Sequence, residues 1–468
     1  MTFAERLREL FVEKSRQELF SGAVLISQNG KSLFEQAYGY ANRSWRVENR
    51  VDTRFRIGSI SKMFTAVAVL QLVDNGKISL DTSVVECLGL RDNKIPKEAT
   101  VYHMLTMTSG IADWFDESGD WDQNWAALCR KHPIYLFRRN QDYLPLFANE
   151  DPIAAVGEKH QYNGAGYILL GLVIEKVSGL SYFDWVSQQV FAPAQMVDSG
   201  FLPLDGVYDR VAEGYMAITD SEEEDKVIGW KRNIYAITPE AAADGGATST
   251  VRDLARFSQA LRGGRLLSAS MTQAMLTPQV LADEEPFRGY IWKYGYANMF
   301  ILDEAGRTVR WGHTGEEDGV SCRLYYYPEH DLDVIILANH GTVSFGENVE
   351  RAYWWTEILD AYCRILMLAR SLGRINYFPE EKERELLELK KDWGFNDPRN
   401  TAAYKNCDIC ANDIFRDSWS KSGVQRSAFE PPPPMAHAPA PPTADPSDAR
   451  EALVQAITER VLSALSGR

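Results

Sequence analysis

The sequence predicts a domain of mixed α and β structure (α/β or α+β), in which a sheet built from both ends of the domain packs against helices. Two pairs of strand patterns predict the sheet, one at 22–37 around an Asn-Gly hairpin turn and one at 322–338. Helical patterns lie between them in the chain, the strongest at 61–75 and 166–177. Strands at both ends with helices between them indicate a layered domain around one large core.

Composition divides the 468 residues into four regions. They are a domain of alternating strand and helix patterns at 1–345, a helical extension at 346–426, a Pro/Ala-rich linker at 427–447 and an amphipathic helix at 448–468. The first region is long enough to bury a large core. The linker contains a run of prolines and cannot build a core, so we expect it to be extended.

Charge and apolar patterning exclude several kinds of partner. Fifty Lys and Arg against 65 Asp and Glu give a net charge of −15, which argues against binding nucleic acid. Residues 1–10 have the pattern of an amphipathic helix rather than of an export signal, and no apolar run approaches the ~20 residues of a membrane span. We therefore expect a cytoplasmic protein that does not bind a membrane.

The six cysteines show no disulfide framework, which is typical of a reducing compartment. Cys407 and Cys410 form a C-x-x-C pair, but no second pair or histidine follows at a spacing that suits zinc. We interpret them as free thiols and expect neither a metal nor another cofactor.

The strongest chemical signal is the segment 59–62, Ser-Ile-Ser-Lys, which opens the most apolar helix of the chain. Residues three apart share one face of a helix, so Ser59 and Lys62 would lie side by side. A serine hydroxyl needs a nearby base to become a nucleophile, and a lysine in a partly desolvated pocket can be that base. A capping serine with a surface lysine is the alternative.

Two further elements could complete such a site. Tyr162 precedes the helical pattern at 166–177, and a buried phenol beside a lysine can pass a proton, although a core tyrosine is equally typical here. His313, Thr314 and Gly315 lie on a predicted strand, where they offer a ring nitrogen, a hydroxyl and close backbone approach. The alternative for this second element is a polar turn with a satisfied histidine.

Together these elements resemble a known family. Ser59-x-x-Lys62, the Tyr162 element and His313-Thr314-Gly315 occur in the order of the S-x-x-K, Y-x-N and K/H-T-G motifs of serine β-lactamases and penicillin-binding proteins. Segments 105–111 and 245–254 look like the class C branch, which includes D-amino acid peptidases and esterases. The resemblance covers about 5–345. It implies a β-lactamase-like sandwich, with a central antiparallel sheet flanked by helices, plus an all-helical subdomain.

The resemblance also implies roles for single residues. Ser59 would be acylated by a carbonyl substrate, Lys62 and Tyr162 would move the proton, and His313 would help to hold the substrate. The backbone N–H groups of Ser59 and of Ser321 or its neighbours would form the oxyanion hole. The expected substrate-binding residues are Asn163, Thr314, Gly315 and Ser321.

The sequence departs from the family pattern at two motif positions. The family has Asn two residues after its tyrosine, where this chain has Gly164, and Asn163 stands one residue early. His313 replaces the lysine of true β-lactamases, and a neutral histidine attracts a substrate carboxylate less strongly. Both departures favour a small ester or amide over a β-lactam or a peptide.

The C-terminal segment 448–468 carries an apolar stripe at four-residue spacing, at Leu453, Ile457, Val461 and Leu465. A helix of this length is marginal in water unless a partner covers that stripe. With its Pro/Ala-rich spacer it resembles the encapsulation peptides of bacterial microcompartment cargo, which implies a shell protein as partner and the microcompartment lumen as location. A homo-oligomerisation helix and a tail that docks on its own domain are the alternatives.

The sequence thus predicts a serine hydrolase that cleaves an ester or amide bond of a small molecule through an acyl-enzyme on Ser59. Esterase, amidase and D-peptidase activities all fit. One alternative is a non-catalytic binding or scaffold module of the same fold, which the Gly164 departure favours. Another is an acyl transferase or peptide cyclase.

Overall fold

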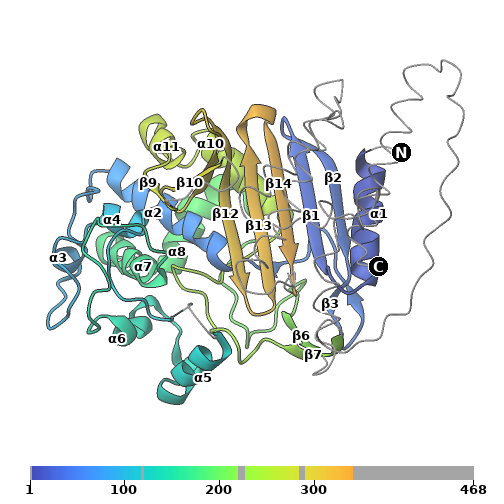
Figure 1. Cartoon of the computed structure of the whole chain (residues 1–468), viewed down its shortest axis with the longest axis horizontal. Coiled ribbons are helices and arrows are strands. Elements are labelled where there is room, and N and C mark those ends of the chain that lie inside the picture. Colours follow the sequence, from blue (N-terminus) through green and yellow to red (C-terminus); the bar gives the residue numbers. More distant parts are fainter. Residues whose placement is uncertain (1–2, 117–120, 220–226, 284–289, 341–468) are drawn as a thin grey trace, which may run out of the picture. The chain divides into compact units, whose positions relative to one another are not determined.

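The computed structural model describes residues 3–116, 121–219, 227–283 and 290–340 (Figure 1). Within these residues the main sheet has eight strands, and every neighbouring pair is antiparallel. In spatial order the strands are β2 (Lys31–Tyr38), β1 (Gly22–Gln28), β14 (Leu332–Ala338), β13 (Val320–Tyr327), β12 (Thr308–Glu317), β11 (Met299–Leu302), β10 (Ile291–Tyr294) and β9 (Val280–Leu281). The predicted mixed fold with a central antiparallel sheet is confirmed.

The two ends of the domain meet within this sheet, at its second and third strands. β1 pairs with β2 on one side and with β14 on the other, so the first strand lies against the last described one. The β1–β2 hairpin turns at Asn29 and Gly30, whose φ angles of 51° and 72° are those that an Asn-Gly hairpin turn requires. The second predicted hairpin is formed by β13 and β14.

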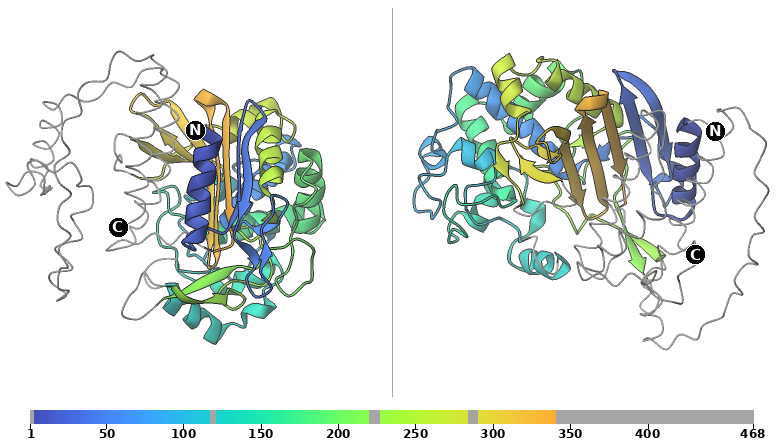
Figure 2. Two further views of the ribbon diagram at one scale, coloured as in Figure 1. Left: turned by 90° about the vertical axis from the view of Figure 1, so that its right-hand side faces the viewer. Right: turned by 45° about the horizontal axis from the view of Figure 1, so that its top comes forward.

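The two faces of the sheet are covered by different helices. Ala23 and Leu25 of β1 belong to the main hydrophobic core, on the face where α10 (Val251–Arg262) packs against β14 and β1. Ile26 points to the other face, because successive residues of a strand alternate, and there it pairs with Phe34 of β2. Phe11 of α1 (Phe3–Arg16) packs on Phe34, so α1 covers that second face beside β2 (Figure 2, left).

Most of the remaining helices gather beside the sheet, around α2 and α7 (Figure 1). The larger ones are α2 (Ser61–Asp74), α3 (Val84–Leu88), α4 (Val101–Leu105), α5 (Trp121–Lys131), α6 (Leu144–Phe147), α7 (Gly164–Ser178), α8 (Tyr182–Val186) and α11 (Ala269–Met275). Shorter turns are η1 (Gly58–Ile60), η2 (Ile134–Leu136), η3 (Asn140–Tyr143), η4 (Ser187–Phe191), α9 (Ala192–Ala194) and η5 (Pro328–His330). Nearly all of α2 is buried on every side, which explains its apolar sequence.

Six short strands form three small ribbons in the connections. They are β3 (Tyr40–Asn42) with β4 (Val47–Glu48), β5 (Phe55–Arg56) with β8 (Thr248–Ser249), and β6 (Tyr215–Thr219) with β7 (Val227–Arg232). The β5–β8 ribbon leads directly into η1 and α2. It therefore fixes the position of Ser59, the predicted nucleophile, just before α2.

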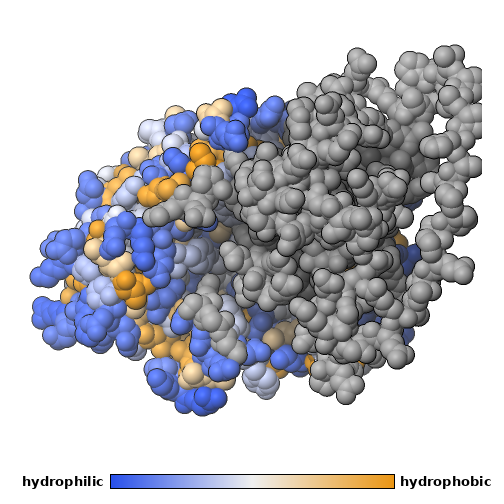
Figure 3. Space-filling model, in the orientation of Figure 1, coloured by the Kyte–Doolittle hydropathy of each residue, from blue (hydrophilic) through white to orange (hydrophobic). Residues whose placement is uncertain are grey.

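Several predictions concern residues outside the described ones: the helical extension, the linker, the terminal helix and the cysteine pair at 407 and 410. In the described ranges no single helix is long and apolar enough to cross a membrane, although the bent pair 164–178 and 182–194 meets the length and composition criteria together. The face in Figure 3 is largely hydrophilic over the helical part, with small hydrophobic areas between, as the acidic composition predicts.

Candidate active site

Ser59 is the point at which a buried segment reaches the surface. Every residue from 57 to 70 is buried except Ser59, which is partly exposed. It lies in η1, one turn before α2, and the first N–H groups of a helix have no partner within it. The structure therefore places the Ser59 hydroxyl and a backbone donor together at a partly exposed position.

Lys62 is buried beside Ser59, with 2% of its surface exposed. Its Nζ donates to Ser59 Oγ at 2.9 Å and to the Asp244 carbonyl oxygen at 2.5 Å. The ring centres of Tyr162 and Tyr167 lie 5.0 Å and 5.9 Å from the same nitrogen. The sequence spacing of three thus gives direct contact between the proposed nucleophile and its base.

The loop at 242–247 is bonded to the start of α2 at several points. Gly246 N donates to the Gly58 carbonyl, Ala247 N donates to Ser61 Oγ, and Thr65 Oγ1 donates to the carbonyl of residue 243. These bonds keep the acceptor of Lys62 in place. They explain structurally why the segment 245–254 stands out in the sequence.

β12 approaches Ser59 from the other side. A Cβ on Gly315 would lie 1.9 Å from the Ile57 carbonyl oxygen, and one on Gly58 would lie 2.9 Å from Glu316 N, so only glycines allow this approach. β11 pairs with residues 308–312 of β12, and within the described chain the part from 313 to 317 pairs only with β13. An edge of strand backbone therefore borders Ser59.

His313 lies on the buried face of β12 and is fully buried. Its Nδ1 lies 2.6 Å from the Thr314 carbonyl oxygen and must carry the hydrogen, so Nε2 accepts from the Tyr294 hydroxyl at 3.2 Å. Burial lowers the pKa of His313 to about 3, and the ring is neutral at ordinary pH. Its ring centre is 6.2 Å from that of Tyr162. Both nitrogens are thus engaged by protein groups.

Asn163 lies at the N-terminus of α7 rather than in an open pocket. Its Oδ1 accepts from Gly166 N at 2.8 Å, which caps the helix, and its Nδ2 donates to the Ile111 carbonyl at 3.0 Å. Only 4% of the residue is exposed. Its amide is occupied by backbone groups, so we leave Asn163 out of the substrate site that we propose.

The space beside Gly164 is filled by two residues that the sequence analysis missed. A Cβ on Gly164 would lie 2.8 Å from both Asp244 Oδ2 and Trp114 Nε1. Trp114 Nε1 donates to that same carboxylate oxygen at 2.8 Å. A signal existed, because Asp244 is the single acidic residue in an alanine- and glycine-rich run, 241–247.

Thr314 and Ser321 complete the set of predicted residues. Thr314 is partly exposed on β12, next to the edge that borders Ser59. Ser321 lies across the ladder on β13, paired with Glu316, and its Oγ accepts from Arg323 at 3.4 Å. The backbone closest to Gly58 belongs to residues 315 and 316, so Glu316 N is better placed than Ser321 N to serve an oxyanion.

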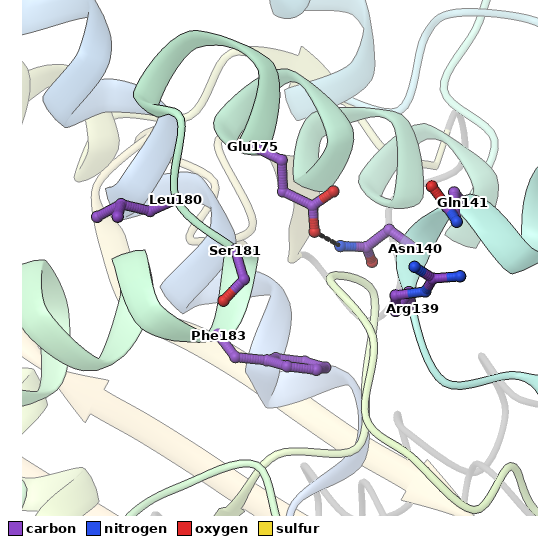
Figure 4. Close-up of a pocket in the computed structure, with 7 residues that line it drawn as sticks. All are labelled: Arg139, Asn140, Gln141, Glu175, Leu180, Ser181 and Phe183. Carbon is purple, nitrogen blue, oxygen red and sulfur yellow. Dashed lines mark hydrogen bonds between the residues drawn. The ribbon is translucent and has the colours of Figure 1, made fainter.

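A separate hollow of about 240 Å³ lies elsewhere on the described surface (Figure 4). Its lining residues are Arg139, Asn140, Gln141, Glu175, Leu180, Ser181 and Phe183. Asn140 Nδ2 donates to Glu175 at 3.2 Å, while its Oδ1 accepts from the N–H of residue 243 at 2.9 Å. The predicted catalytic residues do not line it. Asn140 instead supports the loop that carries Asp244.

A partly exposed serine bonded to a buried lysine, beside a glycine-bearing strand edge, is an arrangement suited to acyl transfer. The chain belongs to the beta-lactamase family, whose model matches residues 7–361.

Several known proteins are similar to this chain over most of its length. The chain is 27% identical over 359 residues to penicillin-binding protein 4* of Bacillus subtilis, covering 72% of this chain and 71% of that one. It is 25% identical to a D-aminopeptidase of Brucella canis over 68% of this chain, but spans only 56% of that protein. The crystal structure of a penicillin-binding protein from Bacillus halodurans superposes with a TM-score of 0.63, at 32% identity, over 75% of this chain and 98% of that one.

Proposed function

We propose that this protein is a serine hydrolase that opens an ester or amide carbonyl through an acyl-enzyme on Ser59. The observation that carries the proposal is the 2.9 Å bond between Lys62 Nζ and the partly exposed Ser59 Oγ. Hydroxyl and base are already in contact, and the base is shielded from water. A surface lysine with a capping serine would show neither feature.

In the proposed reaction, Ser59 Oγ bonds to the substrate carbonyl carbon while its proton passes to Lys62, assisted by Tyr162. The bond to the leaving alcohol or amine then breaks, and the leaving group takes up the proton. Water then attacks the acyl carbonyl carbon by the same proton path, the bond to Ser59 Oγ breaks, and Ser59 is freed as the acid product leaves. The N–H groups of Ser59 and Glu316 stabilise the carbonyl oxygen as it becomes negative.

The surroundings of His313 favour substrates that lack a carboxylate beside the scissile bond. A neutral ring with both nitrogens engaged offers no positive charge there. Thr314 and the edge of β12 remain to bind the substrate backbone or an amide. Small amides and esters therefore fit better than β-lactams, and the D-aminopeptidase relative is consistent with an amide substrate.

Covalent labelling with a fluorophosphonate probe tests the proposal. We expect rapid labelling of the wild type and none of Ser59→Ala. Ser258→Ala is the matched control, because Ser258 is a fully buried serine that donates to Asp333 outside the site, so this variant should still label. Equal labelling of wild type and Ser59→Ala would reject the proposed nucleophile. No labelling and no turnover of any ester or amide would favour the non-catalytic alternative.

For the segment 448–468 we keep the proposal of a docking helix that recruits the enzyme to a microcompartment shell. It rests on the apolar stripe and the Pro/Ala-rich spacer. Deleting 448–468 should leave hydrolysis unchanged and abolish co-assembly with shell proteins in a co-expression assay. Co-assembly that survives the deletion contradicts the proposal, whereas a loss of self-association on sizing would indicate an oligomerisation helix instead.

A further inference from the structure

Position 164, where the family carries an asparagine, is a glycine in this chain. Side chains from other parts of the chain fill the space that the asparagine would occupy. Gly164 has no Cβ, and the atoms nearest to where one would lie are Asp244 Oδ2 and Trp114 Nε1, both at 2.8 Å. The 2.8 Å bond from Trp114 Nε1 holds the carboxylate in this space. An asparagine at 164 and the observed Asp244 carboxylate therefore exclude each other.

The same residue contacts the proposed base through its backbone. Lys62 Nζ donates to the Asp244 carbonyl oxygen at 2.5 Å. The turn around Asp244 is fixed by the bond from Ala242 N to the Gly245 carbonyl at 2.9 Å and by Asn140, which accepts from Ala243 N. The backbone and the side chain of Asp244 thus both border the space around Lys62.

The carboxyl group is also electrostatically coupled to this lysine. Only 8% of Asp244 is exposed, and burial raises the pKa of its carboxyl group, while the Lys62 charge and the Trp114 bond oppose that rise. A backbone hydrogen bond within residue 244 and the Arg56 charge oppose it as well, because a buried carboxylate needs hydrogen-bond donors and nearby cations to remain ionised.

We propose that Asp244, held by Trp114, is a positioning residue that replaces the family's asparagine and sets the orientation and proton affinity of Lys62. The inference rests on the proposed function, because it assigns a partner to the proposed base. It predicts that the missing asparagine does not remove activity, since the space and its polar contact are supplied from another part of the chain.

The test measures the pH dependence of kcat/KM on an activated ester. In Asp244→Asn the acid limb should move to lower pH by roughly one unit, because loss of a neighbouring negative charge favours loss of a proton from an ammonium. Asp244→Asn keeps an oxygen for the Trp114 bond, so folding should be largely retained. An unmoved acid limb in a folded, active variant overturns the proposal.

Asp333→Asn is the matched control. Asp333 is also a buried carboxylate, but it accepts from Ser258 and Arg262 outside the site. This variant should lower the melting temperature and leave the acid limb in place. An equal shift of the acid limb in both variants would mean a general effect of charge and would overturn the assignment to Asp244.

A residue swap tests the replacement itself. Gly164→Asn alone should lower kcat/KM at least tenfold, because its side chain collides with Asp244 and with the Trp114 ring that Asp244 holds. Adding Asp244→Ala removes one collision and the bond that fixes Trp114, and should recover at least tenfold of that loss. Losses that simply multiply in the double variant overturn the proposal. If the proposed function itself is wrong, the wild type would also fail to label at Ser59. That result distinguishes its failure from failure of the role assigned to Asp244.

Discussion

Burial decides the protonation state of two histidines near the site. Burial lowers the pKa of His160 to about 4 and that of His313 to about 3. The two rings flank Tyr294: the His160 ring contacts it in a tilted arrangement, with 4.9 Å between ring centres, and His313 bonds to its hydroxyl. At residue scale, two neutral histidine rings therefore lie beside Tyr294 near the site.

These lowered pKa values predict an acid-sensitive fold. The unfolded chain has histidines near their ordinary pKa of ~6.5, so between pH 6.5 and 4 it binds protons that the folded chain does not, and stability falls as pH falls. His160 alone should account for up to about 2 kcal/mol lost between pH 7 and pH 5. His160→Phe, which retains the ring contact with Tyr294, should reduce that loss in urea denaturation at the two pH values. Identical losses in both proteins would contradict this prediction.

At the scale of elements, the site depends on how closely η1 and β12 approach. The β5–β8 ribbon and the Arg56–Glu317 ion pair, with atoms 2.6 Å apart, hold the two elements together. Gly58 lies at the contact with a φ of 50°, in the left-handed region that favours glycine. Element packing, rather than any single side chain, therefore sets the distance between the two proposed oxyanion donors.

Gly58→Ala should reduce activity, whereas a change from glycine to alanine at a left-handed position away from the site should not. The new Cβ would lie 2.9 Å from Glu316 N and push β12 away, which should lower kcat/KM by more than about tenfold. Gly76→Ala is the control: Gly76 has a φ of 64°, but its Cβ would meet open space. Both variants should lose roughly 1 kcal/mol of stability from the left-handed backbone, but only Gly58→Ala should lose activity. Equal kcat/KM values would show that the contact is unimportant.

At the scale of the whole domain, α2 joins the sheet to the helical part. Phe64 is fully buried and meets Phe191 of η4 edge-on at 5.0 Å and Phe257 of α10 at 4.9 Å. One ring thus packs on both the helical cluster and a helix that covers the sheet. The helix that carries the proposed base is also the centre of the core, so the geometry of the proposed site and global stability are linked.

Phe64→Ala should remove about 3–5 kcal/mol of unfolding free energy, because it leaves a cavity at the junction of the two parts. Trp45→Ala, at a residue that is 82% exposed, should change stability by less than about 0.5 kcal/mol. Denaturant titration of the two variants checks both values. A loss below about 1 kcal/mol in Phe64→Ala would mean that the helical part and the sheet are not coupled through α2.

The sequence by itself determined the features that depend on neighbours along the chain. The three-residue spacing of Ser59 and Lys62 fixes their contact by helix geometry, and the Asn-Gly turn fixes the first hairpin. The capping role of Asn163 was also readable in principle, because an asparagine directly before a helical pattern is a local signal.

Only the tertiary structure decided which residues surround Lys62. Asp244 and Trp114 are 182 and 52 positions away in the chain, so no local pattern joins them to it. The space beside Gly164 is filled only when the loop that carries Asp244 folds into it. Helix and turn geometry act between near neighbours, whereas the contents of a buried pocket are set by packing of segments that are distant in sequence.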